Sequence, residues 1–241
     1  MSQNIAIIFA GGSGKRMQTK ARPKQFLELH NKPIIVYTLE LFENHPDIDG
    51  IYVACVAEWI GYLEELVRRY ALTKVKRIVP GGSTGQESIY NGLAAAEADG
   101  CGPDSIALIH DGVRPLIDSE TISANIDTCR REGSCITCVP AIETFVVRQD
   151  DGTLRIPPRT DSLIARAPQT FRLADILDAH RQARQEGRND FIDSCTMMSH
   201  YQRRLATVIG PTENIKITTP TDFYIFRAIE EMRENSQIFG I

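Results

Sequence analysis

Short apolar runs alternate along the chain with segments whose apolar positions recur every three or four residues. The apolar runs are continuous, which is typical of strands in a parallel sheet that helices cover on both faces. The expected strands are 5–10, 50–56, 75–80, 105–111, 134–142 and 205–210. The expected helices are 33–43, 58–70, 88–98, 118–133, 173–186, 191–200 and 219–234. This alternation predicts an α/β fold with a Rossmann-like, doubly wound and mostly parallel sheet.

The alternation of strand and helix stops at residues 143–160. The pattern there is a strand, a turn at Asp151-Gly152 and a second strand. A two-stranded hairpin is only marginally stable in water on its own, and packing against a second subunit would stabilise it. We therefore expect a β-arm at about 143–160 that projects from a single domain spanning residues 1–241 and forms a homodimer.

Composition and charge narrow the possible partners. The 241 residues carry a formal net charge of −4 at pH 7, with 42% hydrophobic and 24% charged residues. A mildly acidic chain gives no general reason to expect binding to nucleic acid or to an anionic membrane. No apolar run approaches the roughly 18 residues of a membrane span, and MSQNIAIIFA lacks the pattern of a signal peptide. We expect a cytoplasmic protein with no nucleic-acid and no membrane partner.

The chain contains six cysteines, two of which, Cys135 and Cys138, form a CxxC pattern. A zinc site would need a second pair of ligands, and no other pair has the required spacing. Positions three apart on a strand also point to opposite faces of a sheet. We interpret both residues as core cysteines.

The segment FAGGSGKRMQTKARPKQF, residues 9–26, combines a glycine turn with a cluster of lysines and arginines. A Walker loop would need Ser or Thr after Gly14-Lys15, where the chain has Arg16, and the dinucleotide fingerprint would need a third glycine in place of Met17. Glycines still allow backbone N–H groups to approach phosphate oxygens, and the cations supply the opposite charge. We interpret the segment as a binding site for phosphate groups.

Other expected strand ends carry polar residues as well. In open α/β sheets, ligands bind beyond the carboxyl ends of the strands, so these residues should meet in space. The strand at 75–80 runs into GGSTGQES, and the strand that ends at Asp111 is followed by Arg114. Arg159 lies at the foot of the expected arm, and Lys216 lies just before the last helix. Together these residues predict a site for several phosphates, with Asp111 in contact with Mg²⁺ directly or through water.

Several motifs follow one another in a characteristic order. They are AGGSGKRM (10–17) with PKQF (23–26), the glycine-rich segment 81–89 with Ser88, HDGVRP (110–115), APQTF (167–171) and NIKITTPTD (214–222). Over residues 5 to 232 the chain thereby resembles the cytidylyltransferases that act on methylerythritol phosphate and on ribitol phosphate. The resemblance implies a Rossmann-like CTP-binding domain, a dimer with interlocking β-arms, and Mg²⁺-dependent synthesis of a CDP-polyol with release of pyrophosphate.

The resemblance also implies roles for individual residues. Those that would contact CTP are Ala10, Gly11, Gly12, Ser13, Gly14, Lys15, Gly82, Ser83, Ser88, Asp111 and Gly112. Those with a catalytic role would be Arg16, Lys24, Arg159 and Lys216, the first two as stabilisers of the transition state. Those that would hold the polyol phosphate are Arg114, Thr144, Arg159 and Lys216. Thr144 and Arg159 would reach from the arm into the site of a partner subunit.

The chain departs from its relatives in the nucleotide loop and at positions that bear on the acceptor. Many relatives carry an arginine in a GGxxxR stretch where this chain has Gly85, which bears on the nucleotide contacts of that loop. The AGG sequence, the valine of HDGVRP and the DSC sequence at 193–195 favour the ribitol-phosphate branch. We expect transfer of CMP from CTP to a polyol phosphate such as ribitol 5-phosphate. Methylerythritol phosphate, or another polyol or sugar phosphate used for surface glycopolymers, is an alternative acceptor.

The expected chemistry explains why the motifs contain cations and no catalytic triad. A phosphate monoester has its second pKa near ~6, so the nucleophile is largely ionised at neutral pH and needs no general base. Positioned cations and a metal ion carry the charge that builds on the leaving group. A non-catalytic CTP-binding module and a dinucleotide-dependent dehydrogenase are the alternatives from other classes. The assignment requires that Lys24 and Lys216 share one cleft.

Overall fold

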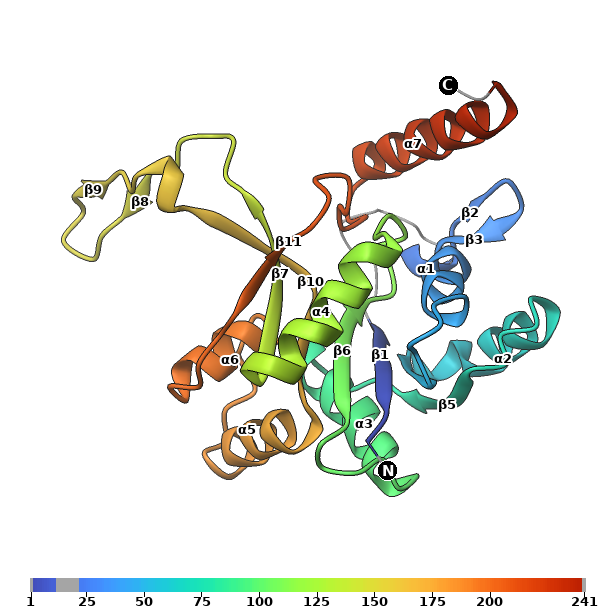
Figure 1. Cartoon of the computed structure of the whole chain (residues 1–241), viewed down its shortest axis with the longest axis horizontal. Helices are drawn as coiled ribbons and strands as arrows, with labels where there is room; N and C mark the ends of the chain where they lie inside the picture. Colours follow the sequence, from blue (N-terminus) through green and yellow to red (C-terminus); the bar gives the residue numbers. More distant parts are fainter. Residues whose placement is uncertain (1, 12–21, 240–241) are drawn as a thin grey trace.

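The fold is built around one seven-stranded sheet (Figure 1). This computed structural model describes residues 2–11 and 22–239 of the chain. In their order across the sheet, the strands are β11 (Thr207–Ile209), β7 (Ser134–Pro140), β10 (Leu163–Arg172), β6 (Ile106–Asp111), β1 (Asn4–Ala10), β4 (Gly50–Cys55) and β5 (Val75–Pro80). β1 pairs in parallel with β6 on one side and with β4 on the other. Its continuous apolar sequence fits this place, because both of its faces are covered.

β10 is antiparallel to both of its neighbours, β6 and β7. The apolar pattern predicts no strand at 163–172, and that expectation is wrong. The sequence LIARAPQTFR mixes charged and apolar residues and contains a proline, so it lacks the pattern of a buried strand. Its pairing with β7 shifts register between Ala165 and Gln169, which accommodates the proline. The prediction of a mostly parallel, doubly wound sheet is confirmed.

Seven α-helices occupy the described part of the chain, at the places where the sequence predicts them. They are α1 (Ile34–Glu43), α2 (Ile60–Arg69), α3 (Gly85–Ala98), α4 (Ser119–Glu132), α5 (Leu173–Gln185), α6 (Ser194–His200) and α7 (Pro220–Phe239). Shorter elements are the 3-10 turns η2 (Lys24–Phe26), η3 (Ala57–Trp59) and η4 (Arg159–Asp161), and the ribbon of β2 (Glu28–Leu29) with β3 (Lys32–Pro33).

The helices form two layers, one on each face of the sheet. Ile8 of β1 packs in a core with α1, α2 and α4, whereas its neighbour Ile7 packs in a second core with α3, α5 and α6. Cys135 and Cys138 lie in these two different cores, which confirms that they point to opposite faces of the sheet. A third cluster fixes α7, whose Phe226 is fully buried with Ile217.

Local capping sets the ends of the helices next to the sheet's carboxyl edge. α3 begins three residues before its predicted start, because the Thr84 hydroxyl accepts a hydrogen bond from the Glu87 N–H at 3.1 Å. α4 starts and stops as predicted: Asp118 accepts from the Thr121 N–H at 2.7 Å, and Gly133 ends the helix with φ of +85°. The Thr84 and Asp118 caps mark where the loops after β5 and β6 end, and the parallel pairing of the strands places both loops at the same edge of the sheet.

The predicted arm is present and projects away from the sheet (Figure 1). It pairs β8 (Val147–Arg148) with β9 (Leu154–Arg155), and Gly152 turns the chain with φ of +82°. Its exposed apolar side chains are Ile142, Phe145, Val146, Val147, Leu154, Ile156 and Leu163. In the described part of the chain, no helix has both the length and the apolar composition that crossing a membrane would require.

Candidate functional site

A pocket of about 410 Å³ lies at the carboxyl ends of β1, β5 and β6. We call it the main pocket. It is lined by Phe9, Ala10, Gly11, Lys24, Gln25, Gly82, Ser83, Thr84, Gly85, Ser88, Asp111, Val113 and Lys216. Lys24 and Lys216 therefore share one cleft, as the assignment from sequence requires.

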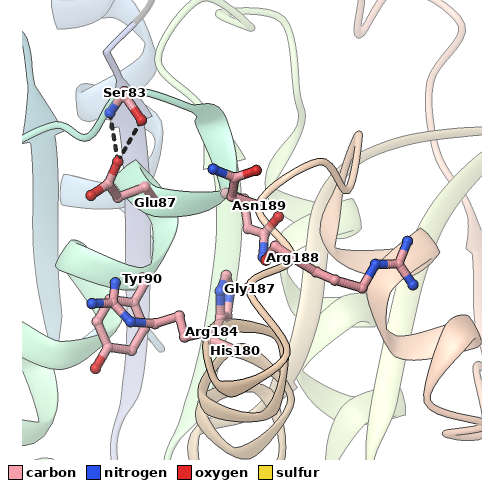
Figure 2. A pocket seen from close by; sticks show the side chains of 9 residues that line it. Ser83, Glu87, Tyr90, His180, Arg184, Gly187, Arg188 and Asn189 are labelled. Carbon is pink, nitrogen blue, oxygen red and sulfur yellow. Dashed lines mark hydrogen bonds between the residues drawn. The ribbon is translucent and has the colours of Figure 1, made fainter.

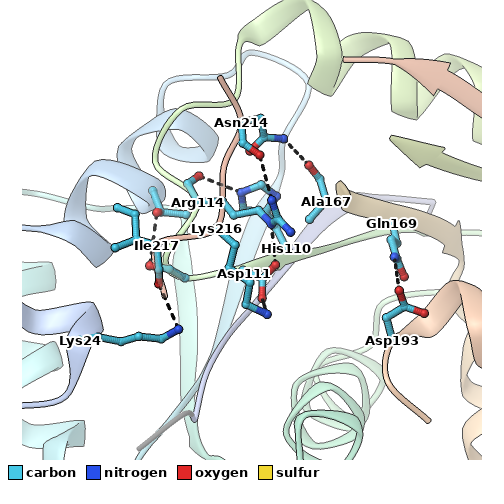
Figure 3. Close-up of polar contacts among 12 residues, drawn as sticks. Lys24, His110, Asp111, Arg114, Ala167, Gln169, Asp193, Asn214, Lys216 and Ile217 are labelled. Atoms are coloured by element: carbon cyan, nitrogen blue, oxygen red, sulfur yellow. Dashed lines mark hydrogen bonds and ion pairs between the residues drawn. The ribbon is translucent and has the colours of Figure 1, made fainter. Parts of the chain in front are cut away.

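Asp111 is the charged centre of this pocket (Figure 3). It is the last residue of β6, and one carboxylate oxygen accepts from Arg114 Nε at 2.7 Å while the other contacts Lys216 Nζ at 2.5 Å. Burial raises the pKa of Asp111, but the two cations outweigh it and lower that pKa to about 2. The carboxylate is thus ionised at neutral pH, and it fixes the position of the Lys216 ammonium.

Hydrogen bonds hold the segment that carries Lys216 against the end of β6. Arg114 Nη1 donates to the Asn214 carbonyl at 2.8 Å, and Asn214 Nδ2 donates to the Ala167 carbonyl at 2.6 Å. The Ile217 N–H donates to the Val113 carbonyl at 2.9 Å. Lys216, just before α7, is thereby brought next to Asp111, which ends β6 about one hundred residues earlier in the chain.

Lys24 reaches the pocket from the short turn η2. Its Nζ donates to the Ile217 carbonyl at 3.1 Å (Figure 3). The two residues that follow anchor the turn: the buried Gln25 side chain donates to the Ala10 carbonyl at 2.6 Å, and the Phe26 ring stacks on Trp59 with 4.9 Å between ring centres. The motif PKQF thus consists of one lysine directed into the pocket and two buried side chains that position it.

The loop after β5 forms the wall opposite Lys24. The Ser88 hydroxyl accepts from the Gly82 N–H at 3.0 Å and donates to the Thr84 carbonyl at 2.9 Å. A Cβ atom on Gly11 would lie 2.8 Å from that hydroxyl, so any side chain at position 11 would require the Ser88 hydroxyl or the loop that carries it to shift. A Cβ atom on Gly85 would have no neighbouring atom within 4 Å, so the start of a side chain meets no obstacle at this position.

A second hollow, of about 300 Å³, adjoins the main pocket. We call it the side pocket. It shares Phe9, Gly85, Asp111 and Lys216 with the main pocket, and its other lining residues are Ile89, Ile109, Arg114, Ala165, Arg166, Ala167, Gln169, Ile192, Asp193 and Ser194. The two pockets together could accept two ligands whose reacting groups meet beside Asp111 and Lys216.

A third hollow, of about 310 Å³, lies between α3, α5 and the loop that follows α5 (Figure 2). There the Arg184 guanidinium lies 4.4 Å from the centre of the Tyr90 ring. Glu87 accepts hydrogen bonds from the Ser83 N–H at 2.7 Å and from its hydroxyl at 2.8 Å. Ser83 borders both this hollow and the main pocket. The hydrogen bonds from Ser83 to Glu87 therefore hold the loop after β5 in place on the side that faces away from the main pocket.

Comparison with known proteins identifies the family. A profile of the IspD family, described as 2-C-methyl-D-erythritol 4-phosphate cytidylyltransferase, matches residues 4–232. The chain belongs to this family of cytidylyltransferases. The resemblance drawn from the sequence motifs and the expectation of a nucleotidyltransferase are both confirmed.

Individual relatives of this cytidylyltransferase differ in the acceptor that they are named for. The ribitol-5-phosphate cytidylyltransferase of Streptococcus agalactiae serotype V is 53% identical over 239 residues, covering 99% of each chain. A 2-C-methyl-D-erythritol 4-phosphate cytidylyltransferase of Clostridium botulinum is 36% identical over 232 residues, covering 96% of this chain and 99% of the relative. The crystal structure of 4-diphosphocytidyl-2C-methyl-D-erythritol synthase from Anaerococcus prevotii has the same fold, with a TM-score of 0.80 at 24% identity over 95% of this chain and 96% of that chain.

The cytidylyltransferase structure brings most of the predicted site residues together. Eight of them line the main pocket: Ala10, Gly11, Lys24, Gly82, Ser83, Ser88, Asp111 and Lys216. Gly112 lies beside it, with its N–H donating to the Phe9 carbonyl at 3.0 Å, and Arg114 lines the side pocket. Five predicted residues lie outside the described part of the chain: Gly12, Ser13, Gly14, Lys15 and Arg16.

Thr144 and Arg159 are exposed on the arm and line neither the main nor the side pocket of their own chain. The Arg159 guanidinium makes a long contact of 3.4 Å with the Ile142 carbonyl. A role for these two residues therefore requires the pocket of another subunit.

The structure also adds site residues that the sequence analysis did not name. Gln25 and Asn214 fall within the PKQF and NIKITTPTD motifs, so those motifs could have identified them. Arg166, Gln169 and Asp193 reach the side pocket from β10 and from the residue that caps α6. Gln169 falls within the APQTF motif and Asp193 within the DSC sequence, so those segments could have identified them. The missed strand explains Arg166, because the position of β10 within the sheet directs this side chain to the pocket.

Proposed function

We propose that this cytidylyltransferase transfers the CMP unit of CTP to ribitol 5-phosphate, giving CDP-ribitol and pyrophosphate. The observation that carries the proposal is the convergence of Lys24, Lys216 and the ion-paired Asp111 where the two pockets meet. The 53% identity to a ribitol-5-phosphate cytidylyltransferase favours ribitol 5-phosphate as the acceptor. We treat residues 1–241 as one nucleotidyltransferase domain acting in the cytoplasm, where CTP is made.

In the proposed reaction an oxygen of the acceptor's phosphate attacks the α-phosphorus of CTP. A new P–O bond forms there, and the bond to the β-phosphate oxygen breaks, so that pyrophosphate leaves with the electron pair. The acceptor phosphate is largely ionised at neutral pH, since its second pKa is near ~6, and no protein base is required. The protein must instead bring two anions together and stabilise the charge that develops on the leaving group.

The cations of the main pocket are placed for this task. Lys24 is held by the anchored turn η2, and Lys216 is held by Asp111, so neither ammonium needs to reorganise during the reaction. A pre-positioned donor of this kind is worth about 3 kcal/mol of transition-state stabilisation, or about a hundredfold in rate. We propose that Arg16 adds a further cation, and that Ala10 to Lys15 form the backbone cradle of the triphosphate.

The residues of the main pocket fit a Mg²⁺ ion held mainly by the nucleotide. Among the described lining residues, Asp111 is the one carboxylate, and no group of three His, Cys, Asp or Glu side chains gathers there to form an all-protein site. Mg²⁺ in nucleotide sites typically binds one or two carboxylates, with phosphates and water completing its shell. We propose that Asp111 holds the ion directly or through water, and that the ion, when bound, neutralises charge on the triphosphate.

We further propose that the arm mediates a homodimer in which Thr144 and Arg159 reach the acceptor site of the partner subunit. The exposed apolar side chains on the arm support this, since Ile142 is 74% exposed and Leu154 and Ile156 are each 62% exposed. Apolar surface of this kind is typical of an interface. Sedimentation equilibrium tests the proposal: a monomer at micromolar concentration would contradict it.

Pyrophosphate release from CTP and Mg²⁺, measured with a panel of acceptors, tests the proposed reaction. We expect ribitol 5-phosphate to give the highest kcat/KM. Preference for methylerythritol phosphate would replace the acceptor and keep the reaction class. CTP binding without pyrophosphate release from any polyol phosphate would favour a non-catalytic module instead.

A further inference from the structure

The side pocket contains buried polar atoms that have no partner. Arg166 Nε is fully buried and unpaired, and this arginine makes no hydrogen bond or ion pair with any residue that the structure describes. Ser194 is only 3% exposed, and its hydroxyl also has no partner among those residues. Both side chains line the same hollow, from different elements of the fold: β10 and α6.

Unpaired groups of this kind are unusual inside a protein. Buried donors and acceptors are nearly always satisfied, because leaving one without a partner costs more than the hydrogen bond itself is worth. Arg166 is unfavourably placed in a second respect, since burial and the nearby Arg114 cation both lower its pKa. An arginine whose Nε is buried without a partner beside a pocket suggests that a bound ligand satisfies it.

The neighbouring polar groups of the side pocket are, by contrast, already engaged. Gln169 Nε2 donates to Asp193 at 3.2 Å (Figure 3). Gln169 Oε1 accepts from the Cys195 N–H at 2.8 Å. Asp193 also accepts from the Thr196 N–H at 2.9 Å, as the cap of α6. These bonds tie β10 to α6 and make a fixed wall, in which Arg166 and Ser194 have polar atoms left unpaired among the described residues.

We infer that Arg166 and Ser194 are specificity-determining residues, which hydrogen-bond the hydroxyl groups of the acceptor's polyol chain. This inference rests on the proposed function. The acceptor's phosphate lies by Lys216, where the two pockets meet, and the rest of the acceptor extends into the side pocket. An unbranched polyol phosphate carries a free hydroxyl on every carbon except the one that bears the phosphate, and these hydroxyls can satisfy both residues. A methyl branch facing Ser194 would leave that hydroxyl unpaired, which is an effective way to reject an analogue.

The test compares two acceptors in two variants, Ser194→Ala and Arg166→Met. Ribitol 5-phosphate reaches both residues, whereas glycerol 3-phosphate is shortened by two hydroxyl-bearing carbons. We expect each variant to raise the KM for ribitol 5-phosphate at least tenfold while the KM for CTP stays within twofold. The kcat/KM for glycerol 3-phosphate should change less than threefold. The variants should therefore lose most of the wild-type preference for ribitol 5-phosphate over glycerol 3-phosphate.

Matched controls separate hydroxyl recognition from loss of structure. Ser199→Ala alters an exposed serine on α6, and Arg172→Gln alters an exposed arginine on β10. Both should retain the wild-type kinetics with either acceptor. Thermal unfolding of all four variants checks that each one folds, and Arg166→Lys should recover part of the lost preference, because it restores a donor.

The outcomes distinguish this inference from the proposed function. Suppose that the wild type uses ribitol 5-phosphate, but kcat/KM in the variants falls by the same factor with both acceptors or does not fall with either. The inference is then wrong and the proposed function stands. If the wild type uses methylerythritol phosphate and not ribitol 5-phosphate, the proposed acceptor fails, and the recognition of an unbranched chain fails with it.

Discussion

The substitution Asp111→Asn isolates the charge at the centre of the site with almost no change in shape. Arg114 and Lys216 lower the pKa of Asp111 from 3.8 to about 2, and the carboxylate is 7% exposed. A shift of this size corresponds to about 2 kcal/mol of stability at neutral pH. Removing one member of a buried pair can cost about 3–5 kcal/mol. We therefore expect the free energy of unfolding at pH 7 to fall by about 2–4 kcal/mol.

The direction in which the stability difference changes with pH follows from the direction of the pKa shift of Asp111. The pKa of Asp111 is lower in the folded protein than in the unfolded chain. The ionised carboxylate therefore stabilises the fold fully above about pH 4, and this contribution is lost as the pH falls toward 2. The difference in unfolding free energy between wild type and variant should thus shrink to about half between pH 7 and pH 3.

Urea titrations at pH 7 and pH 3 measure this difference. Asp127→Asn is the matched control, because Asp127 also pairs with an arginine three residues away, at 3.4 Å, but is 71% exposed. Such surface pairs contribute about 0–1 kcal/mol. Equal losses in the two variants at pH 7, or a loss in Asp111→Asn that does not change with pH, would refute the electrostatic account of this site.

Three further predictions follow from the same geometry. Lys24→Ala should lower kcat by about a hundredfold while the protein stays folded, with only a small fall in the urea midpoint from the lost hydrogen bond to Ile217, and unchanged turnover would contradict the role given to Lys24. Arg159→Ala should raise the KM for the polyol phosphate and leave the KM for CTP unaltered, as measured by pyrophosphate release; equal effects on both substrates would argue against an acceptor contact. Gly11→Ala should weaken CTP binding, measured by calorimetry, because the new methyl group would lie 2.8 Å from the Ser88 hydroxyl; unchanged affinity would show that the two loops can separate at little cost.

Most of the sheet could be predicted because its strands carry a local signal. A strand such as β1, covered on both faces, must be apolar at nearly every position, and that pattern is visible without knowledge of its neighbours. β10 carries no such signal. Its sequence contains Arg166 and a proline, and its place between β6 and β7 depends on pairing with strands that are distant in sequence.

Some residues of the candidate site could likewise be predicted from the local sequence, and others could not. The glycine turns, the end of β6 and the motif around Lys216 are short segments whose composition indicates phosphate chemistry, so Asp111 and Lys216 could be named in advance. Arg166 could not be named, because a lone arginine has no distinguishing pattern, and the DSC sequence marked the segment that contains Ser194 without singling out that residue. Their significance lies in being buried and unpaired, which is a property of the surroundings.

The sequence by itself determined the family, every strand of the main sheet except β10, the helices, and the set of cations expected to meet phosphate. Each of these depends on residues close together along the chain. Only the tertiary structure decided that Asp111 and Lys216 form one ion pair, and that β10 and α6 enclose a second pocket beside it. Contacts between segments about one hundred residues apart depend on how the layers pack, and no local pattern encodes them.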